Sequence, residues 1–232
     1  MTGLLVPAGV AAVGVLAAGV YYPNAPLFGR AIGRGPRDGR SLYLTFDDGP
    51  NPETTDRILD TLEASRVPAA FFMVGDHVRR FATAARRAAG LGYLIGNHTQ
   101  HHVKLHVRGP ARVRSELQEA HDTIATVTGQ QPRVFRAPHG YRNPFVGFAA
   151  RRLGYQVIGW TFGVWDSDRP PAVEIRSRVR AKLRPGAIIL LHDGDGSNPY
   201  GDRRPTAEAL SGVIEDARAA GYEFRSLGEL LA

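Results

Sequence analysis

Short apolar segments alternate with longer helical segments along most of this 232-residue chain, and this alternation constrains the fold more than any other feature. Period-two and short apolar runs predict strands at 41–46, 69–74, 93–97, 133–135, 155–160, 187–191 and 222–225. Helical patterns predict helices at 53–65, 78–89, 110–128, 144–153, 172–183, 206–220 and 227–231. Strands that alternate with helices form parallel sheets with crossover connections, so we expect an α/β fold, either closed into a barrel or doubly wound.

The N-terminal segment differs from the rest of the chain. Residues 4–22 are nineteen residues without a charge, and a helix of that length, at ~1.5 Å per residue, roughly matches the ~30 Å core of a bilayer. We therefore expect residues 1–22 to be a transmembrane helix or uncleaved signal anchor, with Tyr21 and Tyr22 at the interface. A cleaved secretory signal is the alternative, although no Lys or Arg precedes the apolar stretch. A buried helix is a third interpretation.

Residues 23–40 are rich in Pro, Gly and Arg and are interpreted as a linker, which leaves one globular domain at 41–232. The chain carries a net charge of +7, but no predicted helix has a concentrated basic face, so we expect no nucleic-acid partner. It contains no cysteine, which excludes disulfides, thiolate nucleophiles and cysteine-bound zinc. Any metal must be bound by histidine and carboxylate side chains.

Five polar clusters each follow a predicted strand. They lie at 45–50, 98–102, 136–140, 160–168 and 190–193. Sites in parallel α/β folds form at the carboxyl ends of strands, so we expect side chains from these clusters to converge at one mouth.

The first two clusters predict a metal site. Asp47 and Asp48 precede a Gly-Pro turn that can direct both carboxylates into a site, where one binds metal and the other acts as a base; a simple polar turn is the alternative. His98 and His102 are four residues apart, the spacing that places two imidazoles on one face of a helical turn. Two histidines and one carboxylate suit one catalytic divalent ion, Zn²⁺ first, with Co²⁺, Mn²⁺, Ni²⁺ or Fe²⁺ as other occupants.

Two further clusters offer groups for proton transfer and charge. His192 closes an apolar run and could protonate a leaving group. Arg136 stands at another strand end, where its fixed charge could hold a catalytic carboxylate ionised, although a surface salt bridge is its simpler interpretation.

The residues at 45–50 and 98–102, with the later clusters in the same order, resemble the polysaccharide deacetylase family, also called carbohydrate esterase family four. The resemblance covers 41–232. It implies a distorted (β/α) barrel with about seven parallel strands, here preceded by the N-terminal hydrophobic helix. It also implies metal-dependent hydrolysis of an N-acetyl, or less often an O-acetyl, group on a sugar.

The resemblance also assigns roles to single residues. Asp47 would be the general base tethered by Arg136, Asp48 would bind the metal with His98 and His102, and His192 would be the general acid. The family usually has an aromatic residue at the position of His139, where the backbone N–H is thought to stabilise the oxyanion. The fourth motif departs most from the family, because its Trp and Asp residues occur in another order. Pocket-wall residues implied by the resemblance are His139, Trp160, Trp165 and Leu190.

Several properties stay open at the level of sequence. The expected partner is an acetylated glycan: peptidoglycan, a chitin oligomer, xylan or a lipid-linked sugar, with the loop at 194–205 as the expected specificity element. A metal-containing carbohydrate-binding protein without turnover is the alternative function.

The side of the membrane on which the domain lies is also open. Positive charge after the apolar segment favours a cytoplasmic domain, whereas action on a wall polymer requires the opposite side. We expect a single-pass anchor in the cell membrane with an extracytoplasmic domain, and secretion as the alternative.

Overall fold

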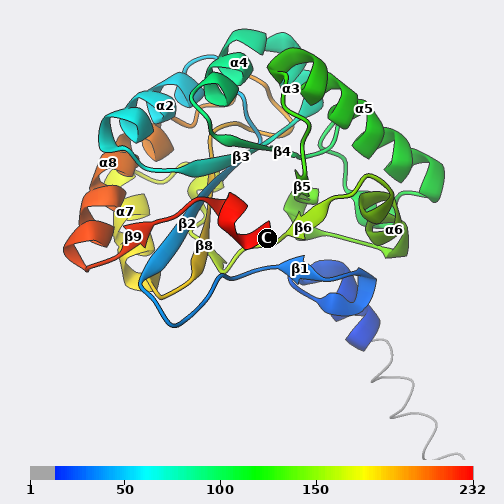
Figure 1. The fold of residues 1–232 in the computed structure, drawn as a ribbon, viewed down its shortest axis with the longest axis horizontal. Coiled ribbons are helices and arrows are strands. Elements are labelled where there is room, and N and C mark those ends of the chain that lie inside the picture. Colours follow the sequence, from blue (N-terminus) through cyan, green and yellow to red (C-terminus); the bar gives the residue numbers. More distant parts are fainter. Residues whose placement is uncertain (1–13, 232) are drawn as a thin grey trace, which may run out of the picture.

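The structure, a computed structural model, describes residues 14–231 and contains one curled parallel sheet (Figure 1). Its strand order is β1-β6-β5-β4-β3-β2-β8-β7, with β9 beside β2, and every strand pair is parallel. The path ends at β1 and β7, so the sheet curls without closing into a full barrel. The strands are β1 (Ala31–Ile32), β2 (Ser41–Asp47), β3 (Ala69–Met73), β4 (Leu94–Asn97), β5 (Val134–Phe135), β6 (Gln156–Ile158), β7 (Phe162–Gly163), β8 (Ala187–His192) and β9 (Glu223–Phe224).

Helices cover the outer face of this sheet (Figure 1). The largest apolar cluster joins α2 and α8 to the central strands, and Phe46, Phe71 and Ile189 within it are fully buried. The helices are α2 (Thr54–Ser65), α3 (Gly75–Arg80), α4 (Ala82–Gly90), α5 (Pro110–Thr128), α6 (Pro144–Arg152), α7 (Ala172–Lys182) and α8 (Arg204–Ala219). Short 3₁₀ turns are η1 (Pro26–Phe28), η2 (Leu105–Val107), η3 (Pro138–Gly140), η4 (Asp166–Asp168) and η5 (Leu227–Leu231).

All seven predicted strands are present, and the structure adds β1 and β7. Each added strand has two residues, which is too short to produce a periodic pattern in the sequence. The predicted helix at 78–89 is instead the pair α3 and α4, because Phe81 leaves the helical region with φ −118° and ψ 49°. The segment at 227–231 is a 3₁₀ helix.

Residues 23–40, interpreted from the sequence as a Pro-, Gly- and Arg-rich linker, pack against the domain over part of their length. Within this segment, Ala31 and Ile32 pair in parallel with β6 and extend the sheet. The buried guanidinium of Arg142 donates to the carbonyl oxygens of Ala25 and Gly29, and so fixes the segment against the domain. The Pro and Gly residues of this segment therefore belong to an irregular backbone that packs against the domain.

Residues 4–13 of the membrane helix predicted at 4–22 lie outside the described residues. Residues 14–21 are helical. Over the part of the chain that the structure describes, 14–231, none of the helices has both the length and the apolarity needed to cross a membrane. The N-terminal anchor stays a prediction.

Candidate active site

The carboxylate of Asp47 ends β2 and is fixed by a buried arginine. Arg136, which is fully buried, donates from one guanidinium nitrogen to Asp47 Oδ1 at 2.6 Å and to the Thr45 hydroxyl at 2.9 Å. Its other terminal nitrogen donates to the carbonyl of Gly159 at 2.9 Å. A buried guanidinium needs such partners, because an uncompensated buried charge is costly. Arg136 therefore leaves Oδ2 as the freer oxygen of Asp47, which lies 3.8 Å from His98 Nε2.

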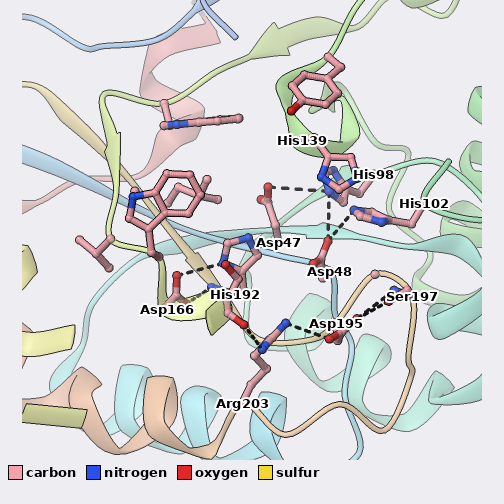
Figure 2. A pocket seen from close by; sticks show the side chains of 18 of the residues that line it. Asp47, Asp48, His98, His102, His139, Asp166, His192, Asp195, Ser197 and Arg203 are labelled. Atoms are coloured by element: carbon pink, nitrogen blue, oxygen red, sulfur yellow. Dashed lines mark hydrogen bonds and ion pairs between the residues drawn. The ribbon is translucent and has the colours of Figure 1, made fainter. Parts of the chain in front are cut away.

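Three side chains form a compact set of metal-ligating atoms. One ligand atom from each of Asp48, His98 and His102 lies within 4.8 Å of the others. Asp48 Oδ1 is 3.3 Å from His98 Nε2 and 3.0 Å from His102 Nε2 (Figure 2). Two imidazole nitrogens and a carboxylate oxygen at these separations fit one divalent ion and leave room for further ligands. Among residues 14–231, no other group of three histidine or carboxylate side chains has its ligand atoms so close together.

A neighbouring hydrogen bond orients one of these imidazoles. His98 Nδ1 donates to the carbonyl oxygen of Arg136 at 2.8 Å, which leaves the Nε2 lone pair directed at Asp48. The same arginine thus supports both the base candidate and a metal-ligand candidate, through its side chain and its backbone respectively. Coupling of this kind is typical of the hydrogen-bonded shell around metal sites.

The spacing of His98 and His102 brings the two together, but not through a helical turn as expected. Residues 98–102 form a loop after β4, in which Thr99 and His102 have positive φ values of 70° and 52°. The side-chain oxygen of Asn97 accepts from the Thr99 N–H at 2.8 Å and stabilises the bend. The left-handed backbone at Thr99 and His102 turns the loop back on itself. The imidazole rings of His98 and His102 therefore both approach Asp48, and their centroids are 5.1 Å apart.

The general-acid candidate lies beside Asp47 on the neighbouring strand. In the register of β2 and β8, His192 is the partner of Asp47. Asp166, fully buried at the side chain, accepts from His192 Nδ1 at 3.0 Å and from its backbone N–H at 2.7 Å. Burial alone would lower the pKa of His192, but the charge and hydrogen bond of Asp166, with the charges of Asp48 and Asp47, raise it to about 9. The imidazole is therefore protonated at neutral pH, with Nε2 available to the site.

Another buried carboxylate, Asp193, lies against the turn at Gly49 that follows Asp47 and Asp48. Asp193 donates its N–H to the Asp47 carbonyl at 3.1 Å and accepts the Thr55 hydroxyl at 2.6 Å. Burial raises the pKa of Asp193 to about 7. A Cβ placed on Gly49 would lie 2.0 Å from Asp193 Oδ2, so only glycine allows this loop to pack so closely on that carboxylate.

A cavity of about 700 Å³ opens over these groups. Such a volume is in the range of small-molecule sites. His139 has a left-handed backbone (φ 58°), and burial together with the charge of His102 lowers its pKa to about 4, so the imidazole is neutral. Trp165 also has φ 58° and stands 70% exposed at the rim. The wall includes the sequence-predicted residues His139, Trp160, Trp165 and Leu190, together with Lys104, Tyr141, Asp195 and Arg203.

The structure thus brings every sequence-predicted site residue to one cavity or its immediate support. Sequence reasoning missed Asp166 as the partner of His192, and Thr45 as a second acceptor for Arg136. Asp166 lies within the fourth cluster, so a carboxylate was visible there. No periodic signal connects it to a histidine 26 residues away.

The chain is similar to known proteins in both sequence and fold. Residues 34–158 match the family model for polysaccharide deacetylase. A chitooligosaccharide deacetylase from Rhizobium leguminosarum bv. trifolii is 36% identical over 82% of this chain and 91% of its own length. The solved structure of the Bc1960 peptidoglycan N-acetylglucosamine deacetylase, 28% identical, has a TM-score of 0.80 and covers 86% of this chain and 91% of that chain.

A third similar protein is described differently. A family four pseudoenzyme from Bacillus anthracis is 29% identical, with a TM-score of 0.78 over 87% of this chain and 69% of that one. The fold is therefore compatible with proteins of both kinds. On the family model and on identity above 30% over most of both chains, this chain belongs to the polysaccharide deacetylase family, the carbohydrate deacetylases of family four.

Proposed function

We propose that this protein is a metal-dependent hydrolase that removes N-acetyl groups from an oligomeric or polymeric amino sugar. The observation that carries the proposal is the alignment of Asp47 and His192 on adjacent strands, beside the Asp48, His98 and His102 group. A base candidate, an acid candidate and a metal-ligand set thus share one cavity. An O-acetyl substrate is the second candidate, because the same groups serve ester hydrolysis.

In the proposed mechanism, Asp48, His98 and His102 hold one divalent ion, with Zn²⁺ as our assignment. Bound there, such an ion would supply Lewis-acid polarisation of the acyl carbonyl and a lowered pKa for water. Asp47 takes the proton of the attacking water at Oδ2, because Arg136 engages Oδ1.

The remaining residues act on the departing side of the reaction. We assign stabilisation of the oxyanion to the backbone N–H at His139. His192, protonated through Asp166, donates its Nε2 proton to the leaving nitrogen. Because Asp166 occupies Nδ1, the proton transfer is confined to the nitrogen on the cavity side. Leu190 supplies an apolar wall for the acetyl methyl, and it is 8% exposed.

Chitooligosaccharides and peptidoglycan are the substrates named for the similar proteins, and both carry N-acetylated amino sugars. We propose a substrate of this class here. The rim residues Tyr141, Trp160 and Trp165 support it, because aromatic faces with a polar edge suit the mixed polarity of a sugar ring.

A binding protein without turnover is the competing function, and the pseudoenzyme neighbour makes the comparison necessary. In this chain Asp47, Asp48, His98, His102 and His192 are all present and mutually oriented. A protein that only bound glycan would have no need for the buried Arg136 to Asp47 contact or the His192 to Asp166 contact. We therefore favour the enzyme.

The test is incubation with N-acetylchitooligosaccharides and with purified peptidoglycan, measuring released acetate and newly formed free amine in the same samples. Equal amounts of acetate and amine are expected, because amide hydrolysis produces one of each. Acetate without amine would identify an O-acetyl esterase. Binding of the glycan without either product, by a protein loaded with metal, would overturn the enzymatic proposal.

Replacing Asp166 with asparagine is expected to move the alkaline limb of the pH–rate profile from about 9 toward lower pH. Asp166 raises the pKa of His192, so its loss deprotonates the acid at a lower pH, toward the ~6.5 of ordinary histidine. At pH 8 the rate should fall on the order of tenfold or more. Asp168→Asn, in the same η4 turn, is the matched control. An unchanged alkaline limb in Asp166→Asn would remove His192 from the acid role.

A further inference from the structure

One face of the molecule, away from α7, gathers exposed apolar side chains. These side chains lie on the helix at 14–21 and its end, on η2, and on α6, which Figure 1 places at the opposite side of the view from α7. Tyr22 and Val107 are each 66% exposed and Phe148 is 58% exposed. We call this the aromatic–basic face; its apolar part is Tyr21, Tyr22, Val107, Phe145 and Phe148, and its basic part is Arg108, Arg151 and Arg152.

The elements of the aromatic–basic face are bonded to one another. The ring of Tyr21 makes edge contacts with His106 at 5.5 Å and with Tyr141 at 5.2 Å between centroids. The Arg142 N–H donates to the Val20 carbonyl at 3.1 Å. The side-chain amide of Asn143, at the start of α6, donates to three carbonyls of the η2 segment. These contacts join the three elements that carry the exposed groups.

Charge is distributed unevenly around this face. The chain has 22 acidic residues, yet none lies in the stretches 1–37, 77–115 or 123–165, from which the aromatic–basic face is built. Among residues 14–231, none of the ion pairs involves Arg108, Arg151 or Arg152. On α6, Phe145, Phe148 and Arg152 recur at the spacing that puts them on one side of a helix. Apolar and positive groups thus share a surface on which, within residues 14–231, the three arginines form no ion pair.

We propose that the aromatic–basic face docks on the surface of an anionic lipid bilayer. Exposed aromatic rings bordered by unpaired arginines are the combination that binds the interface of such a membrane, through apolar burial and attraction to acidic headgroups. A face whose arginines form no ion pair fits a negative surface better than it fits a second copy of itself, since two such faces would repel. Residues 14–29 carry no charge, and Val15 and Leu16 among them are also exposed, which favours lipid over a soluble polyanion.

Docking in this way would place the reaction cavity beside the lipid surface. Tyr141 belongs to both regions, because it lines the cavity and contacts Tyr21 of the aromatic–basic face. A glycan attached to lipid or held close to the membrane would then meet the cavity directly. The docking proposal itself does not depend on turnover, and its test uses no activity measurement.

The test uses the absence of cysteine in the chain. Phe148→Cys, in the full chain, is labelled with the environment-sensitive fluorophore NBD and mixed with phosphatidylglycerol–phosphatidylcholine vesicles. Val173→Cys on α7, at a position 74% exposed, is labelled as the matched control. A blue shift and a severalfold intensity gain are expected at position 148 with anionic vesicles, with no change at position 173.

Other outcomes overturn the proposal. No change at 148, even when the protein sediments with the vesicles, would mean that lipid contacts another part of the chain. Equal changes at 148 and 173 would exclude a defined face. A change at 148 that depends on protein concentration and not on lipid would indicate self-association, and an equal response to pure phosphatidylcholine would exclude the electrostatic component.

A charge variant gives an independent measurement. Arg108→Gln should weaken partition onto the anionic vesicles about fivefold, because one basic residue near such a surface contributes about 1 kcal/mol. Arg180→Gln, an exposed position on α7, is the control. Both positions are exposed, so the fold should persist in each variant. Equal partition of the parent and Arg108→Gln would contradict the proposal.

Discussion

Replacing Asp47 with asparagine is expected to lower the rate of acetate release by about 10²- to 10⁴-fold, the usual contribution of a positioned proton-transfer group. The amide has nearly the same shape and can still accept from Arg136 through its oxygen. It cannot take a proton from the attacking water. Because Asp47 is not one of the three clustered ligand candidates, the variant should still bind one divalent ion per chain. Rate and metal content are measured on the same preparation.

Asp60→Asn is the matched control for this change. Asp60 is an exposed carboxylate on α2 that pairs with Arg87, far from the cavity. Its variant should keep the parent rate. If Asp47→Asn retained a rate near that of the parent, the base assignment would be wrong. If it lost the metal as well, Asp47 would belong among the ligands.

Replacing His98 with alanine is expected to abolish both metal binding and turnover. The substitution removes one of three ligand atoms and also leaves the Arg136 carbonyl without its imidazole donor. Loss of a partner in the surrounding shell alone costs 10–100-fold in affinity, so loss of a ligand should weaken metal binding by more than about 100-fold. Equilibrium dialysis against Zn²⁺ or Co²⁺ measures this directly.

His101→Ala tests whether that effect is specific. His101 lies in the same loop, but its Nδ1 contacts the buried carboxylate of Glu116 at 2.9 Å instead of the metal-ligand group. The His101 variant should keep metal binding close to that of the parent. Unchanged metal affinity in His98→Ala, with the fold intact by circular dichroism, would contradict the proposed ligand set.

The fold was predictable to the extent that its elements are long. Seven strands and the parallel α/β class follow from alternation over several residues. The differences lie in short or irregular segments. β1 and β7 have two residues each, and the packing of 23–40 depends on Arg142, which lies more than a hundred residues away. Hydrophobic periodicity within a short stretch of sequence cannot indicate a contact between residues so far apart.

The sequence indicated which residues gather at the candidate site better than it indicated how the backbone places them. The carboxylates and histidines predicted at strand ends do lie together, because parallel strands bring their carboxyl ends to one edge. The loop that holds His98 and His102 relies on left-handed residues that periodicity does not reveal. Asp166 was missed for a similar reason, since the register of β8 against its neighbours decides what lies beside His192.

The most direct measurement of the central claim is acetate release from an N-acetylchitooligosaccharide by the full chain, after removal of bound metal with a chelator and stepwise return of Zn²⁺. We expect release to stop on chelation and to return in proportion to added metal, with saturation at one ion per chain. Release that persists after complete metal removal, or that stays absent with one ion bound, would contradict a metal-dependent deacetylase built on Asp48, His98 and His102.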